Sequence, residues 1–126
     1  MYSSPHERVT ILCVDDEKRA LVVRKMVLES AGYTVLTADT VLKALEVFKN
    51  RDVDLVITDY LLQRETGSDL AVELRKLSLS LPIMVLTGAV ECIGCVDPPD
   101  YYLHKLEGPA EMIAKVRSIM GTPVGT

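Results

Sequence analysis

The sequence has little that would tie the chain to a membrane, a nucleic acid or an oxidising compartment. Its three cysteines, an odd number, make a poor disulfide framework and fit a reducing interior. No stretch approaches the roughly 20 apolar residues of a membrane span, and residues 1–8 lack the basic-then-apolar form of a signal peptide. The net charge of −4 offers no general attraction for nucleic acid. We therefore expect a cytoplasmic segment without membrane association or direct nucleic acid binding.

Composition and length are those of one globular domain. The 126 residues suit a single domain, because single hydrophobic cores commonly occupy about 100–150 residues. Nearly half of the residues are apolar (48%) and a quarter are charged (25%), which argues against disorder. The chain has no GxGxxG or P-loop sequence, so a nucleotide-binding interpretation has no motif behind it. We expect the domain to cover residues 8–121, with flexible tails at 1–7 and 122–126.

Short apolar segments alternate with helical patterns along the chain. The expected strands cover residues 9–14, 33–38, 53–58, 83–86 and 101–104. The expected helices cover residues 18–30, 40–50 and 68–77, and a last helix begins at Gly108-Pro109 and ends at Gly121. In the first helix, apolar residues near helical spacing are Ala20, Val23, Met26, Val27 and Ala31. A fourth helix near residues 90–100 is expected to be short or irregular, because Pro98-Pro99 interrupt it.

This alternation predicts an α/β fold in which βα repeats surround a parallel sheet. Right-handed crossovers are expected. A flavodoxin-like order of the five strands, 2-1-3-4-5, would make the first and third strands neighbours. The residues that follow these two strands would then lie close together at the carboxyl edge of the sheet.

Aspartates follow both of these strands. Val14 is followed by Asp15 and Asp16, and Thr58 is followed by Asp59. Carboxylates at such short distances from one another raise each other's proton affinity unless a cation binds between them. The arrangement suggests Mg²⁺, which carboxylates and phosphate oxygens would hold, beside a carboxylate that can attack phosphorus. Taken alone, Asp59 would more commonly only cap the end of a strand, and its pairing with Asp15-Asp16 is what favours the chemical role.

Two further residues fall at the carboxyl ends of predicted strands. Thr87 ends the fourth strand, where its hydroxyl can bond a phosphate oxygen, and Lys105 ends the fifth, where its charge can stabilise a transferring phosphoryl group. Each has an ordinary alternative, because threonine is common in turns and lysine is common on surfaces. Their coincidence with the three aspartates favours one common site.

On these residues the chain resembles the receiver domain of bacterial two-component response regulators, the CheY-like fold, over about residues 8–121. Asp15-Asp16 resemble the family's acidic pair, Asp59 its phospho-acceptor, Thr87 its switch hydroxyl and Lys105 its lysine. Gly67 matches the glycine after the acceptor loop, and Tyr102 stands where the family keeps its switch aromatic. The resemblance implies that Asp16, Asp59 and the backbone carbonyl of Leu61 bind Mg²⁺ directly, and that Asp15 binds it through water.

The resemblance also implies a function. A histidine kinase or phosphotransfer protein would donate a phosphoryl group to Asp59, after which Thr87 and Tyr102 would rearrange. The chain would not be an enzyme, but a phospho-acceptor that assists its own phosphorylation and dephosphorylation. The signal would pass to a downstream protein or to an output domain that this chain does not contain. The sequence leaves open whether the domain is free-standing or a fragment of a larger regulator.

Three departures from the family pattern keep a second function class open. Leu106 replaces the proline after the lysine, Gln63 replaces a proline of the acceptor loop, and the distance from Thr87 to Lys105 is short. These departures are compatible with a protein-interaction module that works without phosphorylation. A phosphatase of the haloacid dehalogenase type ranks last, because Leu61 occupies the position of its second aspartate.

The segment Cys92-Ile93-Gly94-Cys95 is a CxxC sequence without a second pair of cysteines. It can bind zinc or form a redox-active disulfide, or it can pack as two small apolar side chains. Because strong zinc signatures come as two paired halves, the sequence favours packing over a metal or redox role.

Overall fold

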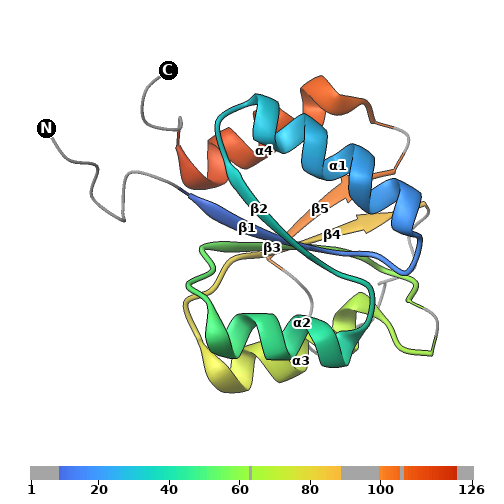
Figure 1. The fold of residues 1–126 in the computed structure, drawn as a ribbon, viewed down its shortest axis with the longest axis vertical. Helices are drawn as coiled ribbons and strands as arrows, with labels where there is room; N and C mark the ends of the chain where they lie inside the picture. Colours follow the sequence, from blue (N-terminus) through green and yellow to red (C-terminus); the bar gives the residue numbers. More distant parts are fainter. Residues whose placement is uncertain (1–8, 63, 89–99, 106, 122–126) are drawn as a thin grey trace, which may run out of the picture.

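Five parallel strands form the central sheet, in the order β2-β1-β3-β4-β5 (Figure 1). The structure is a computed structural model, and it describes residues 9–62, 64–88, 100–105 and 107–121. The strands are β1 (Thr10–Val14), β2 (Thr34–Ala38), β3 (Leu55–Asp59), β4 (Ile83–Thr87) and β5 (Tyr101–His104). All four pairings are parallel. The predicted fold class and strand order are therefore confirmed.

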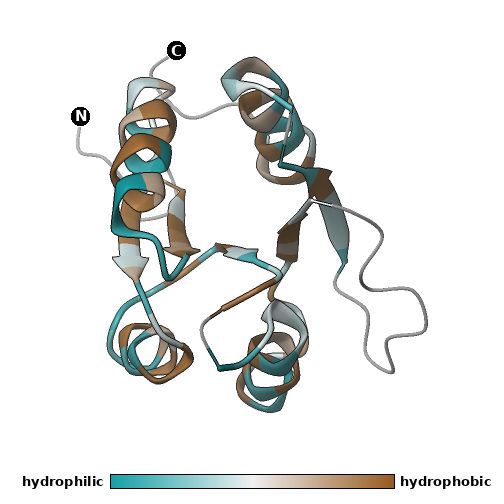
Figure 2. Ribbon diagram, turned by 90° about the vertical axis from the view of Figure 1, so that its right-hand side faces the viewer, coloured by the Kyte–Doolittle hydropathy of each residue, from teal (hydrophilic) through white to brown (hydrophobic). Residues whose placement is uncertain are grey.

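In the described ranges, two helices cover each face of the sheet. The helices are α1 (Lys18–Ser30), α2 (Val41–Asn50), α3 (Gly67–Leu77) and α4 (Pro109–Met120). In Figure 1, α1 and α4 lie on one side of the sheet and α2 and α3 on the other, and Figure 2 shows the same layers after a quarter turn. Every residue of β3 and β4 is buried, because both faces of these central strands are covered.

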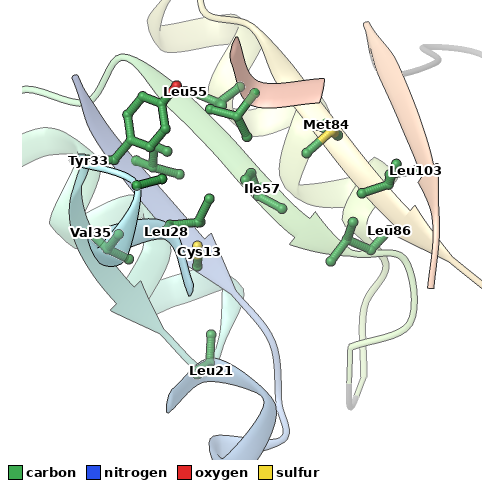
Figure 3. Packing of buried hydrophobic residues seen from close by; sticks show 13 residues of the cluster. Cys13, Leu21, Leu28, Tyr33, Val35, Leu55, Ile57, Met84, Leu86 and Leu103 are labelled. Atoms are coloured by element: carbon green, nitrogen blue, oxygen red, sulfur yellow. The ribbon is translucent and has the colours of Figure 1, made fainter. Parts of the chain in front are cut away.

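The buried side chains form two layers of core. Figure 3 shows the layer between the sheet and the α1–α4 face, where alternate residues of the strands meet α1. Members of this layer include Ile11, Cys13, Leu28, Ile57, Met84, Leu86 and Leu103. The neighbouring strand residues, including Leu12, Val14 and Val56, point the other way. They pack with residues of α2 and α3 that include Ala44, Leu70 and Leu74.

Element ends shift slightly from those predicted. β3 runs one residue further than expected, because Asp59 still pairs with Leu86 of β4, and β4 extends to Thr87. Four helices lie in the part of the chain that the structure describes, one fewer than predicted. The segment expected to hold the additional short helix, residues 89–99 with Cys92 and Cys95, lies outside the described residues. Gln63, Leu106 and the two predicted tails also lie outside the described residues, as does residue 8, which was expected to begin the domain.

The apolar stripe expected on α1 is not its buried face. Leu21 and Leu28 are buried, whereas Val23 and Met26 expose 59% and 65% of their surface. Apolar residues occur all around this helix, so their spacing alone does not determine which side packs against the sheet. A consequence is that Arg24, three residues after Leu21 and four before Leu28, lies on the inner side of α1.

None of the helices in the described ranges has the combination of length and apolar character that crossing a bilayer requires.

Candidate functional site

The three aspartates meet at the carboxyl edge of the sheet. β1 and β3 are paired so that Val14 lies beside Thr58, which brings the residues after them together. One carboxylate oxygen from each of Asp15, Asp16 and Asp59 lies within 4.8 Å of the other two. Asp15 and Asp59 are only 3% and 4% exposed, whereas Asp16 faces solvent. The sheet order thus brings Asp59 to the adjacent pair Asp15-Asp16, which lies 43 or more positions earlier in the sequence.

Both oxygens of Asp15 have partners. Its Oδ1 accepts a hydrogen bond from the backbone N–H of Glu17 at 2.9 Å, which fixes the carboxylate at the start of α1. Its Oδ2 accepts one from Nη2 of Arg24 at 3.2 Å. Sequence reasoning missed Arg24; the available signal was a charged residue at helical spacing between two leucines. Asp15 is therefore oriented by one backbone donor and one cation.

Lys105 reaches the carboxylate of Asp59. Its Nζ lies 2.7 Å from Oδ1 and donates a hydrogen bond to Oδ2 at 2.9 Å. The backbone N–H of Lys105 donates to the carbonyl of Thr87 at 2.9 Å, so the pairing of β5 with β4 continues up to this lysine. The contact joins the predicted lysine to the predicted acceptor across the width of two strands.

Burial raises the pKa of the Asp59 carboxyl above its ordinary value. The hydrogen bond from Lys105 opposes this rise, and the neighbouring negative charge of Asp15 adds to it. A further cation at the cluster would favour the ionised form of Asp59, which is the nucleophilic form.

The donor set fits Mg²⁺. Within the described residues, Oδ1 of Asp59 is buried and receives no hydrogen bond of good geometry, although Lys105 lies near it. Buried polar atoms are rarely left in this state, so this oxygen has capacity for another ligand. Carboxylate oxygens are the ligands that Mg²⁺ prefers, and the exposed side at Asp16 leaves room for the waters that it keeps. Asp15, Asp16 and Asp59 can thus hold one ion together.

A cavity of about 410 Å³ opens beside the three aspartates. Lys105 and Leu61 contribute to its wall, and its far side is formed by residues of α1 and α4, including Ala20, Arg24 and Met112. Leu61 thus lies at the site, and the role of its backbone carbonyl as a metal ligand stays a prediction. The space is large enough for a phosphoryl group and several waters.

The loop after Asp59 is held to the sheet edge by Gly67. The backbone N–H of Gly67 donates to the carbonyl of Tyr60 at 2.6 Å. A Cβ atom at this position would lie 2.7 Å from the backbone oxygen of Asp59. Thr66 and Asp69 form a reciprocal capping box at the start of α3, which fixes the other end of the turn. The acceptor residue is therefore positioned by backbone packing on its own carbonyl.

Thr87 and Tyr102 lie on one face of the sheet. The register pairs Val85 with Tyr102 and Thr87 with His104, so Thr87 and Tyr102 are two positions apart along neighbouring strands. Thr87 is buried and Tyr102 is exposed. Thr87 directly follows Leu86, the β4 partner of Asp59, whereas Tyr102 lies further back along β5, opposite Val85. The proposed movement of both stays a prediction.

A family model for the response regulator receiver domain matches residues 11–117 of the chain. Among curated proteins, the alkaline phosphatase synthesis transcriptional regulatory protein PhoP of Bacillus subtilis is 32% identical over 114 residues, which are 87% of this chain and 48% of PhoP. The phosphate regulon transcriptional regulatory protein PhoB of Pseudomonas aeruginosa is 32% identical over 117 residues, 88% of this chain and 51% of PhoB. The chain spans about half the length of these curated relatives.

Solved structures of response regulators also share the fold of this chain. The response regulator protein TrrA from Thermotoga maritima, in complex with Mg²⁺-BeF, matches with a TM-score of 0.81 and 30% identity over 88% of this chain and 98% of its own. A putative response regulator from Chloroflexus aurantiacus matches with a TM-score of 0.82 and 31% identity over 90% of this chain and 98% of its own.

Proposed function

Because the chain belongs to the response regulator receiver family, we propose that it is a phosphorylation-dependent switch of a two-component system with Asp59 as the phospho-acceptor. One observation carries this proposal: a buried carboxylate that contacts a lysine shares one edge of the sheet with two more carboxylates. The three carboxylates and the lysine together do not favour the alternative, an interaction module that works without phosphorylation. The chain itself would be a phospho-acceptor rather than an enzyme with a separate substrate, and it would work in the cytoplasm.

The carboxylates of Asp15, Asp16 and Asp59, with the carbonyl of Leu61, would hold Mg²⁺. When bound, the ion neutralises the carboxylates and the oxygens of the phosphoryl group in transfer. That TrrA was solved with Mg²⁺-BeF supports this choice of ion.

The remaining chemistry falls to side chains of the chain. An oxygen of Asp59 attacks the phosphorus of a phosphorylated histidine on a histidine kinase or phosphotransfer protein. The bond between phosphorus and the histidine nitrogen breaks as the new bond to oxygen forms, and that nitrogen then takes up a proton. Lys105, already in contact with Asp59, pairs with an oxygen of the phosphoryl group, and the hydroxyl of Thr87 donates to another.

The signal would leave the site through Thr87 and Tyr102. A new dianionic group at Asp59 favours the arrangement in which the Thr87 hydroxyl binds it, and the neighbouring β5 residues then shift between two states. The recipient would be a downstream protein or an output domain outside this chain. Relatives named as transcriptional regulatory proteins are about twice as long as the matched region, which is compatible with an output domain.

The test is exposure of the protein to a small phosphodonor with Mg²⁺, followed by intact-mass measurement. Wild type should gain the mass of one phosphoryl group, Asp59→Ala should gain none, and chelation of Mg²⁺ should abolish the gain. Asp52→Ala is the matched control, because Asp52 is an exposed aspartate in the turn before β3. Equal addition to wild type and Asp59→Ala, or no addition to wild type, would refute the proposal.

A further inference from the structure

Arg24 occupies a place where an arginine needs an electrostatic reason. It lies on the inner side of α1 between the buried Leu21 and Leu28, and its side chain is only 10% exposed. Arginine is almost never buried without a charged partner, because its desolvation is costly. An apolar residue at this position would continue the packing of its two neighbours. Packing therefore does not account for the arginine.

The guanidinium is aimed at the acidic cluster. Its Nη2 contacts Oδ2 of Asp15 at 3.2 Å, and it forms part of the wall of the cavity that holds Asp16, Asp59 and Lys105. Its Nη1 is buried and receives no hydrogen-bond partner among the residues that the structure describes. A guanidinium offers five donors, so Arg24 is incompletely satisfied in its contact with Asp15.

Arg24 and Lys105 together balance most of the charge of the cluster. Three carboxylates against the two cations leave a formal charge of −1, whereas Lys105 alone would leave −2. In the absence of a metal ion, the second cation reduces repulsion among the carboxylates. When a divalent ion binds, the same cation repels it and competes for the Asp15 oxygen.

Space is available for the guanidinium on its other side. Arg24 lines the acidic cavity and also an adjoining groove of about 350 Å³ between α1 and α4. Two acidic residues, Glu17 and Glu107, line both hollows. The side chain can therefore withdraw from Asp15 toward another carboxylate without entering an apolar core.

We propose that Arg24 is a built-in counter-cation of the acidic pocket, which holds Asp15 in the metal-free protein and keeps Mg²⁺ binding weak. The inference rests on the Mg²⁺ site of the proposed function and adds a positioning residue that sets its affinity. Mg²⁺ then binds by exchange with a resident cation rather than by entry into an uncompensated acidic site. The occupancy of the site thus becomes sensitive to the position of one side chain of α1.

The test is titration calorimetry with MgCl₂ at constant ionic strength on the unphosphorylated protein. Arg24→Leu should bind Mg²⁺ about tenfold more tightly than wild type, because one nearby positive charge is removed. Arg24→Gln should tighten binding to a similar degree and carries the test if the leucine variant does not fold. Arg24→Lys retains the charge and should stay within about twofold of wild type. Arg19→Leu is the matched control, since Arg19 is an exposed arginine on the same helix that does not line the acidic cavity.

Each result decides the matter. Equal tightening in Arg19→Leu would show that only net charge matters, and tightening in Arg24→Lys would assign the effect to packing; either would overturn the inference. Unchanged or weaker binding in Arg24→Leu and Arg24→Gln would overturn it as well. If neither wild type nor any variant binds Mg²⁺, the proposed metal site itself is wrong. If all of them bind Mg²⁺ with the same affinity, the metal site stands and only the role of Arg24 is overturned. Larger Mg²⁺-dependent stabilisation of Arg24→Leu against urea should accompany its tighter binding.

Discussion

Substitution of Gly67 by alanine should destabilise the protein by about 2 kcal/mol, although Gly67 is the first residue of a helix. In an exposed helix interior the same change commonly stabilises by up to about 1 kcal/mol. Here the new Cβ would lie 2.7 Å from the backbone oxygen of Asp59 and 3.1 Å from Cγ2 of Thr58. The backbone oxygen belongs to a buried strand and cannot move aside as a flexible side chain would, so steric cost outweighs the gain.

The magnitude follows from where the strain would be relieved. Either β3 shifts at Asp59, or the hydrogen bond of 2.6 Å from the Gly67 N–H to the Tyr60 carbonyl lengthens. Overpacking of this kind costs about 1–3 kcal/mol, and a weakened buried hydrogen bond costs about 1 kcal/mol. Because both routes displace the acceptor loop, phosphoryl uptake should also slow, by about tenfold or more if Asp59 moves by about 1 Å.

Urea unfolding followed by far-UV circular dichroism measures the stability term, with Gly108→Ala as the control. A Cβ at Gly108 would meet no atom within 4 Å, and its φ of −80° suits any residue, so this variant should lose only the roughly 0.5–1 kcal/mol by which alanine is worse than glycine at a helix N-cap. If Gly67→Ala is no less stable than Gly108→Ala, the close approach at Asp59 does not constrain the loop, and the reasoning fails.

Three further predictions concern single groups. Burial raises the pKa of Asp59 in the folded protein, so the wild type loses stability as the pH rises from the pKa of the unfolded state through that of the folded state. In metal-free protein, the stability advantage of Asp59→Asn over wild type should therefore grow from about pH 4 to about pH 7. A difference in urea midpoints that stays constant over this range would contradict the prediction. Burial raises the pKa of the Cys13 thiol to about 12, so mass mapping should find it unalkylated in native protein at about pH 8 and alkylated in urea. Asp100→Ala removes the acceptor of the Ile83 N–H hydrogen bond and the ion-pair partner of Arg75. It should lower the free energy of unfolding by about 1–2 kcal/mol, measured by thermal unfolding, and an unchanged stability would show that these contacts are dispensable.

Much of the acidic site could be predicted from the sequence because its components are local signals. Asp15-Asp16 and Lys105 directly follow their strands, and Asp59 and Thr87 end β3 and β4. In a parallel sheet with helical crossovers, all strand ends of one kind lie at the same edge. Strand order was then the only long-range assumption needed to bring these residues together.

The helices were harder to predict than the strand ends. The residues that end a helix are neighbours in the sequence, whereas the orientation of the helix depends on distant parts of the fold. The ends of α1 follow from the sequence, and Pro109 and Gly121 mark the limits of α4. The buried side of α1 could not be read from apolar spacing, since Val23 and Met26 have the right period and still face solvent. Which apolar residues are buried depends on the angle at which the helix meets the sheet.

The sequence by itself determined the alternation of strands and helices and the acidic edge, because periodicity, caps and strand-end residues are encoded within a few positions of each other. Only the tertiary structure decided that Arg24 reaches Asp15 and that Gly67 touches the carbonyl of Asp59. Those contacts join residues of different elements at distances of a few ångströms. They depend on how helix, loop and sheet pack together, and no local pattern in the chain specifies that packing.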